Sequence, residues 1–197
     1  MKNKFVMSRA RNAAYVQKNM DLLLFNAMKL ARYDVTQEEC LQGIQDEEAA
    51  LAYSNFKRTF EYLQLDKDAE IDYHYLLDLH TLLMEGLQEG FTNNMTDEQI
   101  EELSRIINQP AKANTEIAID AMLYILDKRL FEDGDIRVAL MFANKIMVDN
   151  GNGFITVSPE NAHTFREKLK AYNDTKEAEP FKDWLYKYCI KGKKVYY

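Results

Sequence analysis

The scarcity of glycine and proline is the feature that most constrains how this sequence can fold. Seven Gly and three Pro are spread over 197 residues. A β-sandwich or barrel needs a turn about every 8–12 residues, and turns favour these two residue types. Hydrophobic residues make up 47% of the chain, which is enough apolar material for one buried core. We therefore expect an all-α fold with a single domain of long helices.

The cysteines and the hydropathy pattern restrict the class of protein further. Cys40 and Cys189 are too few, and too distant in the sequence, for a disulfide framework or a zinc site, so we expect buried, reduced thiols. An unbroken apolar run such as residues 138–143 is far shorter than a membrane span. No apolar segment follows the charged first residues as it would in a signal peptide. The sequence thus predicts a cytoplasmic protein with no membrane partner.

Charge is distributed unevenly along the chain. Residues 1–32 carry a net charge of +6, residues 33–104 carry -15 and residues 105–197 carry +2. The basic first segment is compatible with nucleic acid, but the acidic middle repels phosphates and no basic-aromatic recognition motif accompanies it. We expect no nucleic-acid partner. The first segment is instead expected to pack beside the acidic middle, either of the same domain or of another copy.

Apolar residues that recur at intervals of three and four predict the helices. Thr36 and Glu39 form a capping box before a short helix that Gly43 ends, and Thr96 and Asn114 are predicted N-caps. A loop or short β-hairpin is predicted at 90–94, and an extended run at 154–157. The predicted helices cover approximately 8–32, 37–42, 46–64, 72–86, 96–108, 114–128, 135–149, 158–172 and 181–190.

Residues 129–137 form a polar loop between two of the most hydrophobic helices. A glycine turn that leads into a buried helix can bind phosphate, because the first backbone N–H groups of the helix are unpaired and carry a partial positive charge. Asp133-Gly134-Asp135 is such a turn, and Arg137 could add a charge-assisted hydrogen bond. The alternative is an ordinary turn in which Asp135 is the N-cap and Arg137 a surface cation.

The loop Phe131-Glu132-Asp133-Gly134-Asp135-Ile136-Arg137 resembles the signature of Fic-domain proteins, H-x-F-x-[D/E]-G-N-[G/K]-R. The resemblance extends over roughly residues 20–192 and is strongest from 117 to 157. It divides the chain into regulatory-type helices (1–45), a Fic core (46–192) with a β-hairpin flap, and a basic, aromatic tail (193–197). The flanking segments that resemble those of the family are 26–36, 76–83, 121–126, 138–147 and 151–157.

The resemblance implies a helical domain that binds a nucleotide. Active members of the family transfer AMP from ATP to a hydroxyl of a target protein, with Mg²⁺. By position, Phe131 corresponds to the residue that anchors the loop and Asp133 to the magnesium ligand. Gly134 corresponds to the glycine that lets a phosphate approach the backbone closely, and Arg137 corresponds to the first phosphate-binding arginine. The implied cofactors, if the site is active, are ATP and Mg²⁺, and the implied partner is a target protein. A homo-oligomer also remains open.

The loop departs from the family pattern at three positions. Arg129 stands where the catalytic histidine belongs, and a guanidinium does not deprotonate near neutral pH, so it cannot act as a general base. Asp135 replaces the asparagine that meets the phosphates. Two like charges about 4 Å apart repel by roughly 4 kcal/mol at an effective dielectric constant of about 20. Ile136 replaces glycine or lysine.

Two further departures affect regulation and target docking. Leu140 stands where many members have a second arginine, and Ala31 stands where the inhibitory glutamate pairs with it. The inhibitory glutamate and the arginine with which it pairs are therefore both absent from this sequence. The flap residues Phe91-Thr-Asn-Asn lack the basic residue that often follows the flap glycine, so strand-type docking of a target is not expected.

These features leave two hypotheses. The first is a Fic-fold protein with a degenerate adenylyltransferase site; the second is an active transferase of a phosphate-containing group with altered chemistry, using Asp133 and Arg137. Arg129 either forms an ion pair with Asp133 or Glu132 that locks the loop, or offsets the charge of Asp135. His80 lies on an apolar helix face and is expected to be a core residue.

Overall fold

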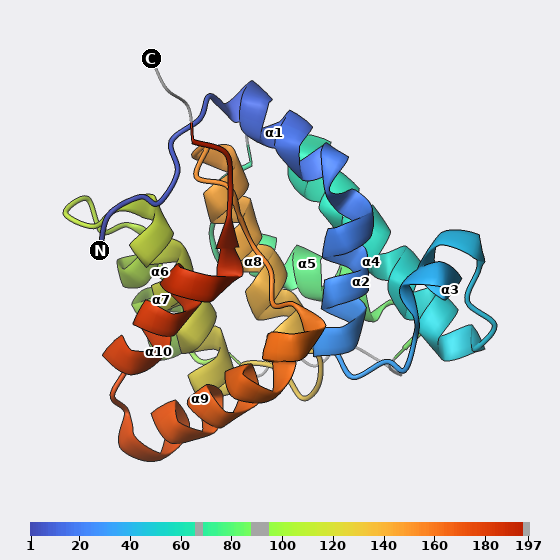
Figure 1. Ribbon diagram of the computed structural model, residues 1–197. Coiled ribbons are helices and arrows are strands. Elements are labelled where there is room, and N and C mark those ends of the chain that lie inside the picture. The colour runs from blue at the N-terminus through green and yellow to red at the C-terminus, as the bar shows by residue number, and fades with distance from the viewer. Residues whose placement is uncertain (66–68, 88–94, 195–197) are drawn as a thin grey trace.

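The computed structural model describes residues 1–65, 69–87 and 95–194, and these form one helical body (Figure 1). Strands β1 (Phe154–Ile155) and β2 (Ile190–Lys191) pair antiparallel, with Phe154 opposite Lys191. The helices are α1 (Arg9–Lys18), α2 (Met20–Leu30), α3 (Gln37–Gln42), α4 (Glu47–Leu65), α5 (Tyr73–Met84), α6 (Asp97–Ile107), α7 (Asn114–Lys128), α8 (Asp135–Asp149), α9 (Ala162–Thr175) and α10 (Glu179–Trp184), with a 3-10 turn η1 (Pro159–Asn161) and a π-helical turn η2 (Leu185–Cys189).

The centre of the molecule is the pair α7 and α8. Every residue of α8 from Val138 to Val148 is buried, Asn144 and Lys145 included. Helices α4 and α5 pack on one side of α8, and α9 and α10 run along the lower part of the view in Figure 1. Because α8 is buried on all sides and mostly apolar, its neighbours enclose it and hold both of its ends in fixed positions. The candidate phosphate loop is its N-terminal end.

The all-α prediction is confirmed, and so are most of the predicted helix ends. Thr36 and Thr96 each form a complete capping box, and Gly43 ends α3 with a positive φ of 130°. Asp72 caps α5. Local sequence is sufficient here because both partners of such a cap lie within three residues of each other. The predicted flap at 90–94 and the tail at 195–197 lie outside the described residues.

Several helix predictions differ from the structure. The predicted 158–172 helix begins as the 3-10 turn η1, and the predicted 181–190 helix gives way to η2 and then to strand β2. The single helix predicted over 8–32 is interrupted at Asn19, whose side-chain Nδ2 donates to the carbonyl of Tyr15 (2.7 Å) and whose backbone leaves the helical region. Asn114 is not an N-cap; Ala113 occupies that position without a capping side chain. Instead, Asn3 Oδ1 accepts the N–H of Thr115 at 3.0 Å. A cap supplied from 112 residues away leaves no signal in the local sequence.

The expected state of the cysteines is confirmed, since Cys40 and Cys189 are both free and buried. Burial raises the pKa of the Cys189 thiol to about 12. Among the described helices, none combines the length and the apolar character that crossing a membrane requires.

Candidate functional site

The loop between α7 and α8 lines a cleft of about 340 Å³. Loop residues Arg129 and Glu132 to Arg137 form one wall. The opposite walls come from the end of α2, at Leu30 to Arg32, and from Leu169 and Asn173 of α9. Except for Phe131, which is buried beneath it, the cleft brings together the site residues that the sequence predicted. It also adds Arg32, which the sequence analysis did not single out.

Phe131 anchors the loop in the core, as its position in the signature implies. The ring is buried and stacks on His80 of α5, with ring centroids 4.1 Å apart and an interplanar angle of 10°. His80 Nε2 donates to the backbone carbonyl of Asp133 at 3.0 Å. Burial lowers the pKa of His80, so the imidazole is neutral at physiological pH. The prediction that His80 is a core residue is confirmed, and its hydrogen bond fixes the middle of the loop.

Gly134 is required by the turn for two separate reasons. Its φ is +88°, in the left-handed region that L side chains rarely adopt. A Cβ atom at this position would lie 2.7 Å from Met84 Sδ, at the end of α5. Gly134 is the N-cap of α8, and its carbonyl accepts the N–H of Val138 at 2.9 Å. The alternative in which Asp135 is the N-cap is therefore wrong, since Asp135 is the first helical residue.

The two loop carboxylates bind backbone N–H groups of the loop itself. Asp133 Oδ1 accepts the N–H of Gly134 at 2.7 Å. Asp135 Oδ1 accepts the N–H of Phe131 at 3.1 Å. The Gly134 N–H, at the start of α8, is the kind of donor that a phosphate would need at a helix N-terminus, whereas the Phe131 N–H lies before the turn. Both N–H groups already have a carboxylate of the loop as their acceptor.

Burial dominates the titration of Asp135. It raises the pKa of this carboxyl to about 6, against the opposing effects of the Phe131 N–H and of the Arg129 charge. Arg129 is exposed and ends α7 in a left-handed conformation, with φ 47°. Among residues 1–65, 69–87 and 95–194, no ion pair joins Arg129 to Asp133. The predicted pair with Asp133 is thus not found, and the charge of Arg129 instead favours the ionised form of Asp135.

Arg137 is held by the segment that follows α2. Its Nη2 donates to the hydroxyl of Tyr33 at 2.9 Å, and its guanidinium carbon lies 5.3 Å from the centre of that ring. The Nη1 group contacts Met84 Sδ at 3.3 Å. The Tyr33 hydroxyl in turn donates to Glu48 Oε1 at 3.3 Å. Burial raises the pKa of Tyr33, and the Arg137 charge opposes this.

The two positions that the resemblance assigns to the missing regulatory pair lie in different surroundings. Ala31 lines the cleft, and Leu140 is buried inside α8. Ile136 is half-buried at the cleft wall. The interactions that sequence reasoning missed are those of Tyr33 and Met84, which hold Arg137 and enclose Gly134. Neither has a local signal, because each meets the loop from a distant part of the chain.

Comparison with solved structures identifies this arrangement of helices. Two structures of Fic-1 from C. elegans, one carrying a single substitution, each match with a TM-score of 0.73 at 13% and 14% identity. The match covers 92% of this chain and 62% of each Fic-1 chain. The chain has the Fic fold. Its sequence matches no protein-family model and no curated protein.

The Fic fold places the 129–137 loop at the N-terminus of the central helix α8. Within the Fic fold of this chain, Phe131 and Gly134 have the surroundings that an anchored loop with a tight turn requires. Asp133 is exposed at the cleft wall, where a carboxylate could contribute one ligand to a cation. Groups of three or more His, Cys, Asp or Glu that could hold a metal are absent from the described part of the chain.

Proposed function

We propose that this protein is a catalytically degenerate Fic domain, which does not transfer AMP and acts by binding a protein partner. One observation carries the proposal: the carboxylates of Asp133 and Asp135 accept the loop N–H groups of Gly134 and Phe131. A loop that fills its own donors gains little from an incoming phosphate, because each new hydrogen bond replaces an existing one.

The absence of a general base supports the same proposal. Arg129 occupies the position of the catalytic histidine and stays protonated at any physiological pH. His80 is the nearest imidazole to the loop, but it is buried, stacked on Phe131 and bonded to the Asp133 carbonyl. It cannot take a proton from a hydroxyl in the cleft without leaving the core.

Electrostatics disfavours a triphosphate at this loop. Above pH 6 the Asp135 carboxyl is ionised for most of the time, given its pKa of about 6. Its charge lies beside the donors that a phosphate would use, and like charges at about 4 Å repel by roughly 4 kcal/mol in a partly solvated site. Arg137, which could offset this repulsion, is already engaged by Tyr33.

A second function, transfer of a phosphate-containing group with altered chemistry, is favoured by the cleft itself. The cleft remains open at about 340 Å³, and Arg32 and Arg129 both line it. If ATP and Mg²⁺ bind, Asp133 is the residue that would hold the metal, which would neutralise phosphate charge. The bound nucleotide would then have to displace the hydrogen bond between Asp133 and the Gly134 N–H.

Thermal melting with Mg-ATP tests the proposal. A ligand present at one hundred times its Kd stabilises a protein by about 2.7 kcal/mol, which is roughly 5–10 °C for a chain of this size. We expect no shift for the wild-type protein at millimolar Mg-ATP. Asp135→Asn should gain more ATP affinity than Arg129→His, because the first change removes a repulsion and the second supplies only a base.

Transfer of label from labelled ATP to proteins of a lysate provides the second readout. We expect none from the wild-type protein, and Asp133→Ala is the matched control. Label that is transferred by the wild-type protein and lost in Asp133→Ala would overturn the proposal in favour of the active transferase. Asp133 is suited to this control because its side chain is exposed, so its removal leaves the core intact.

A further inference from the structure

Both ends of the described chain contribute to one basic surface. Residues 1–20 carry five basic side chains and residues 184–194 carry four, and neither segment contains Asp or Glu. The two segments lie side by side, because Lys4 Nζ donates to the carbonyls of Tyr186 and Lys187 at 2.7 and 2.9 Å. We call this surface the basic face. Its exposed cations include Lys2, Lys187, Lys191, Lys193 and Lys194.

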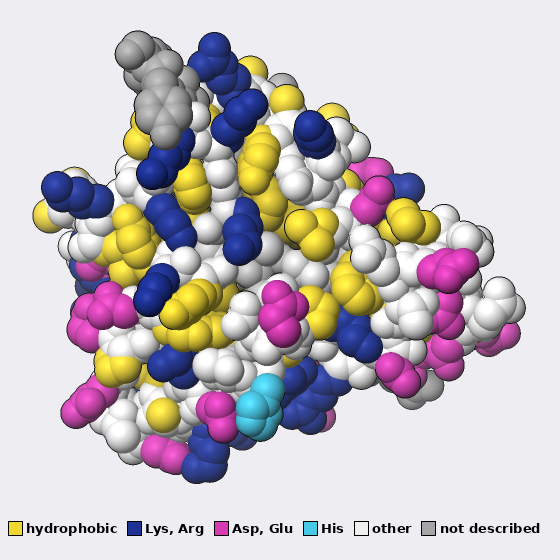
Figure 2. Space-filling model, viewed as in Figure 1, with side chains coloured by type: hydrophobic (Ala, Val, Ile, Leu, Met, Phe, Trp, Pro, Cys, Tyr) yellow, Lys and Arg dark blue, Asp and Glu magenta, His cyan; other side chains and the backbone are white. Residues whose placement is uncertain are grey.

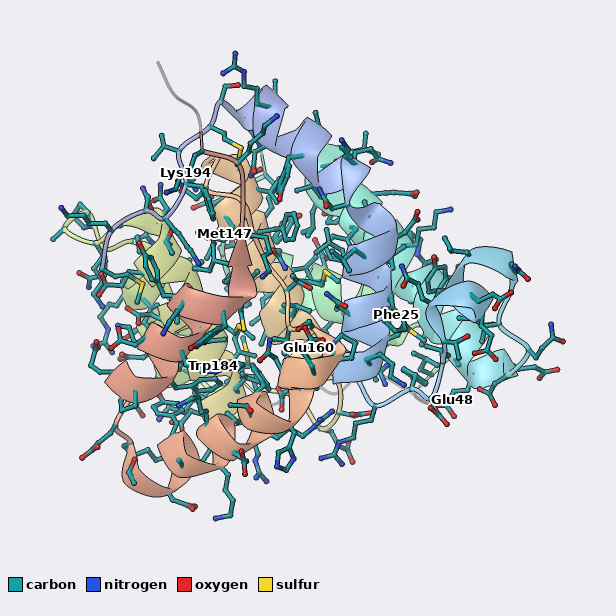
Figure 3. The ribbon with its side chains drawn as sticks, in the orientation of Figure 1. Phe25, Glu48, Met147, Glu160, Trp184 and Lys194 are labelled. Carbon is teal, nitrogen blue, oxygen red and sulfur yellow. The ribbon has the colours of Figure 1, made fainter. Side chains whose placement is uncertain are left out.

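An acidic surface lies at the other side of the molecule. It is formed by α3 and the start of α4, and its exposed acids include Glu38, Glu47 and Glu48. We call it the acidic end. Magenta side chains gather around α3 at the right of Figure 2, whereas dark blue side chains run down the part that covers β2 and η2. Lys194 and Glu48 are labelled on opposite sides of Figure 3, so these two surfaces cannot pair within one molecule.

Each of the two surfaces also exposes large apolar side chains among its charges. On the basic face, Val6 is 60% exposed and Tyr188 is 43% exposed. On the acidic end, Leu41 is 60% exposed and Leu51 is 37% exposed. A charged surface that also exposes apolar side chains has the composition of a protein interface, where apolar contacts supply affinity and charges supply orientation.

We propose that the basic face of one molecule binds the acidic end of a second copy of this chain, in a head-to-tail arrangement. In a contact between two copies, the basic face and the acidic end neutralise each other's charges, whereas a separate polyanion would cover the basic face alone. The formal net charge of -7 also opposes the approach of a nucleic acid or an anionic membrane. Because the two surfaces differ, the contact is heterologous and repeats from copy to copy, into a ring or an open chain.

Sedimentation velocity over a range of concentrations tests this contact. At low salt we expect the average mass of the wild-type protein to rise above that of a monomer as concentration increases. High salt should return it to the monomer, because exposed charges are screened. K187E/K191E and E38K/E47K should each weaken association by roughly tenfold or more. Monomeric wild-type protein at every concentration in low salt would overturn the proposal.

A mixture of the two variants is the decisive arm of this experiment. K187E/K191E keeps a normal acidic end and E38K/E47K keeps a normal basic face, so the mixture should associate although each variant alone does not. K128E/K168E changes the net charge as much as K187E/K191E but lies on α7 and α9, and it should lose far less association. Thermal melting of each variant checks that it is folded.

Binding to a labelled oligonucleotide and to anionic vesicles covers the other partners of a basic surface. We expect K187E/K191E to change neither by as much as it changes self-association. If it abolishes binding to either polyanion while the wild-type protein remains monomeric, the basic face serves that polyanion and the proposal is wrong. Failure of these experiments does not bear on the cleft, since no residue changed here lines it.

Discussion

Both ends of α8 carry a glycine turn flanked by Asp or Asn, but the two turns differ in burial and in hydrogen bonding. At its N-terminal end, the turn Asp133-Gly134-Asp135 is open to a cleft, and carboxylates accept the backbone N–H groups of the loop. At its C-terminal end, the turn around Gly151 and Gly153 is buried, and the side-chain amides of asparagines form hydrogen bonds with backbone groups there. There, Asn12 Nδ2 donates to the carbonyl of Gly153 at 3.0 Å.

The buried turn at the C-terminal end of α8, with its asparagine hydrogen bonds, is called the C-terminal junction here. It also joins both ends of the described chain. Met7 N donates to the Gly151 carbonyl at 2.8 Å, and Asn152 Nδ2 donates to the Phe5 carbonyl at 2.8 Å. Strand β2 pairs with β1 directly after it. Buried neutral amides with good partners specify one arrangement of the backbone, whereas partly exposed carboxylates respond to pH and to ligands. The C-terminal end of α8 thus contributes mainly to stability, whereas the N-terminal end holds the candidate functional site.

Substitution of the two turn glycines provides the strongest test of this comparison. A Cβ on Gly153 would lie 2.0 Å from the Lys191 carbonyl oxygen, and its φ is +84°. Because a backbone atom cannot move aside, we expect Gly153→Ala to destabilise the protein by roughly 3–5 kcal/mol. Gly134→Ala meets only the flexible side chain of Met84 and should cost roughly 1–2 kcal/mol.

Urea unfolding followed by circular dichroism measures both glycine variants. Gly43→Ala serves as a control for the positive φ alone, because a Cβ there meets nothing within 4 Å. If Gly134→Ala costs as much as Gly153→Ala, the N-terminal end of α8 is as rigid as the C-terminal end, and the comparison fails.

Asn144 is the central amide of the C-terminal junction. Its Nδ2 donates to the carbonyls of Leu140 and Ile155, and its Oδ1 accepts the Ile155 N–H at 2.8 Å. Asn144→Ala would leave the buried Ile155 groups without partners, and we expect a loss of roughly 2–4 kcal/mol in unfolding free energy. Asn173→Ala is the matched control at the cleft and should cost less than about 0.5 kcal/mol. Equal losses in the two variants would contradict the assignment of stability to the junction.

Asp135→Asn should have a smaller effect that depends on pH. The folded-state pKa is raised to about 6 by burial, above the unfolded value of about 3.9. The stability that the protonated carboxyl provides is therefore complete below about pH 4 and is lost as pH rises through about 6. An asparagine keeps an oxygen acceptor for the Phe131 N–H without a charge. We expect the variant to be more stable than the wild-type protein by about 1 kcal/mol at pH 7.5, after a discount for partial exposure.

Melting temperatures at pH 7.5 and at pH 4.5 measure this effect. The advantage of Asp135→Asn should be roughly 2–4 °C at the higher pH and should fall to about a third of that at the lower one. Asp133→Asn, at an exposed carboxyl, is the control and should show a smaller gain, because it removes only the part of the effect on Asp135 that comes from the Asp133 charge. An equal gain at both pH values would mean that the charge of Asp135 does not oppose folding.

Most of the fold could be predicted from the sequence because its signals are local. The capping boxes at Thr36 and Thr96 and the apolar run of α8 each depend on residues within one or a few turns. The interruption at Asn19 and the cap that Asn3 supplies to Thr115 could not be predicted. The latter depends on a contact between distant segments, which periodicity does not report.

The candidate site was predicted residue by residue, but its internal contacts were not. The motif singled out Phe131, Gly134 and Arg137, and the structure places these residues at the cleft or directly beneath it. The motif gave no indication that Tyr33 holds Arg137, or that the carboxylates turn toward the loop backbone. In the described part of the chain, Arg129 forms no ion pair with Asp133, and its charge instead favours the ionised form of Asp135. Short polar side chains can choose among several nearby donors, and only the final packing selects one.

The sequence by itself determined that the chain is helical, which helices it forms, and where a glycine turn enters the most buried helix. These properties depend on side-chain type and on spacing along a single segment. The tertiary structure decided which backbone groups remain free at that turn and which residues enclose the cleft. It also decided that the basic face and the acidic end lie apart from each other on the surface. Those outcomes depend on packing between segments that are far apart in the chain, where small differences in distance change hydrogen bonds and charge interactions.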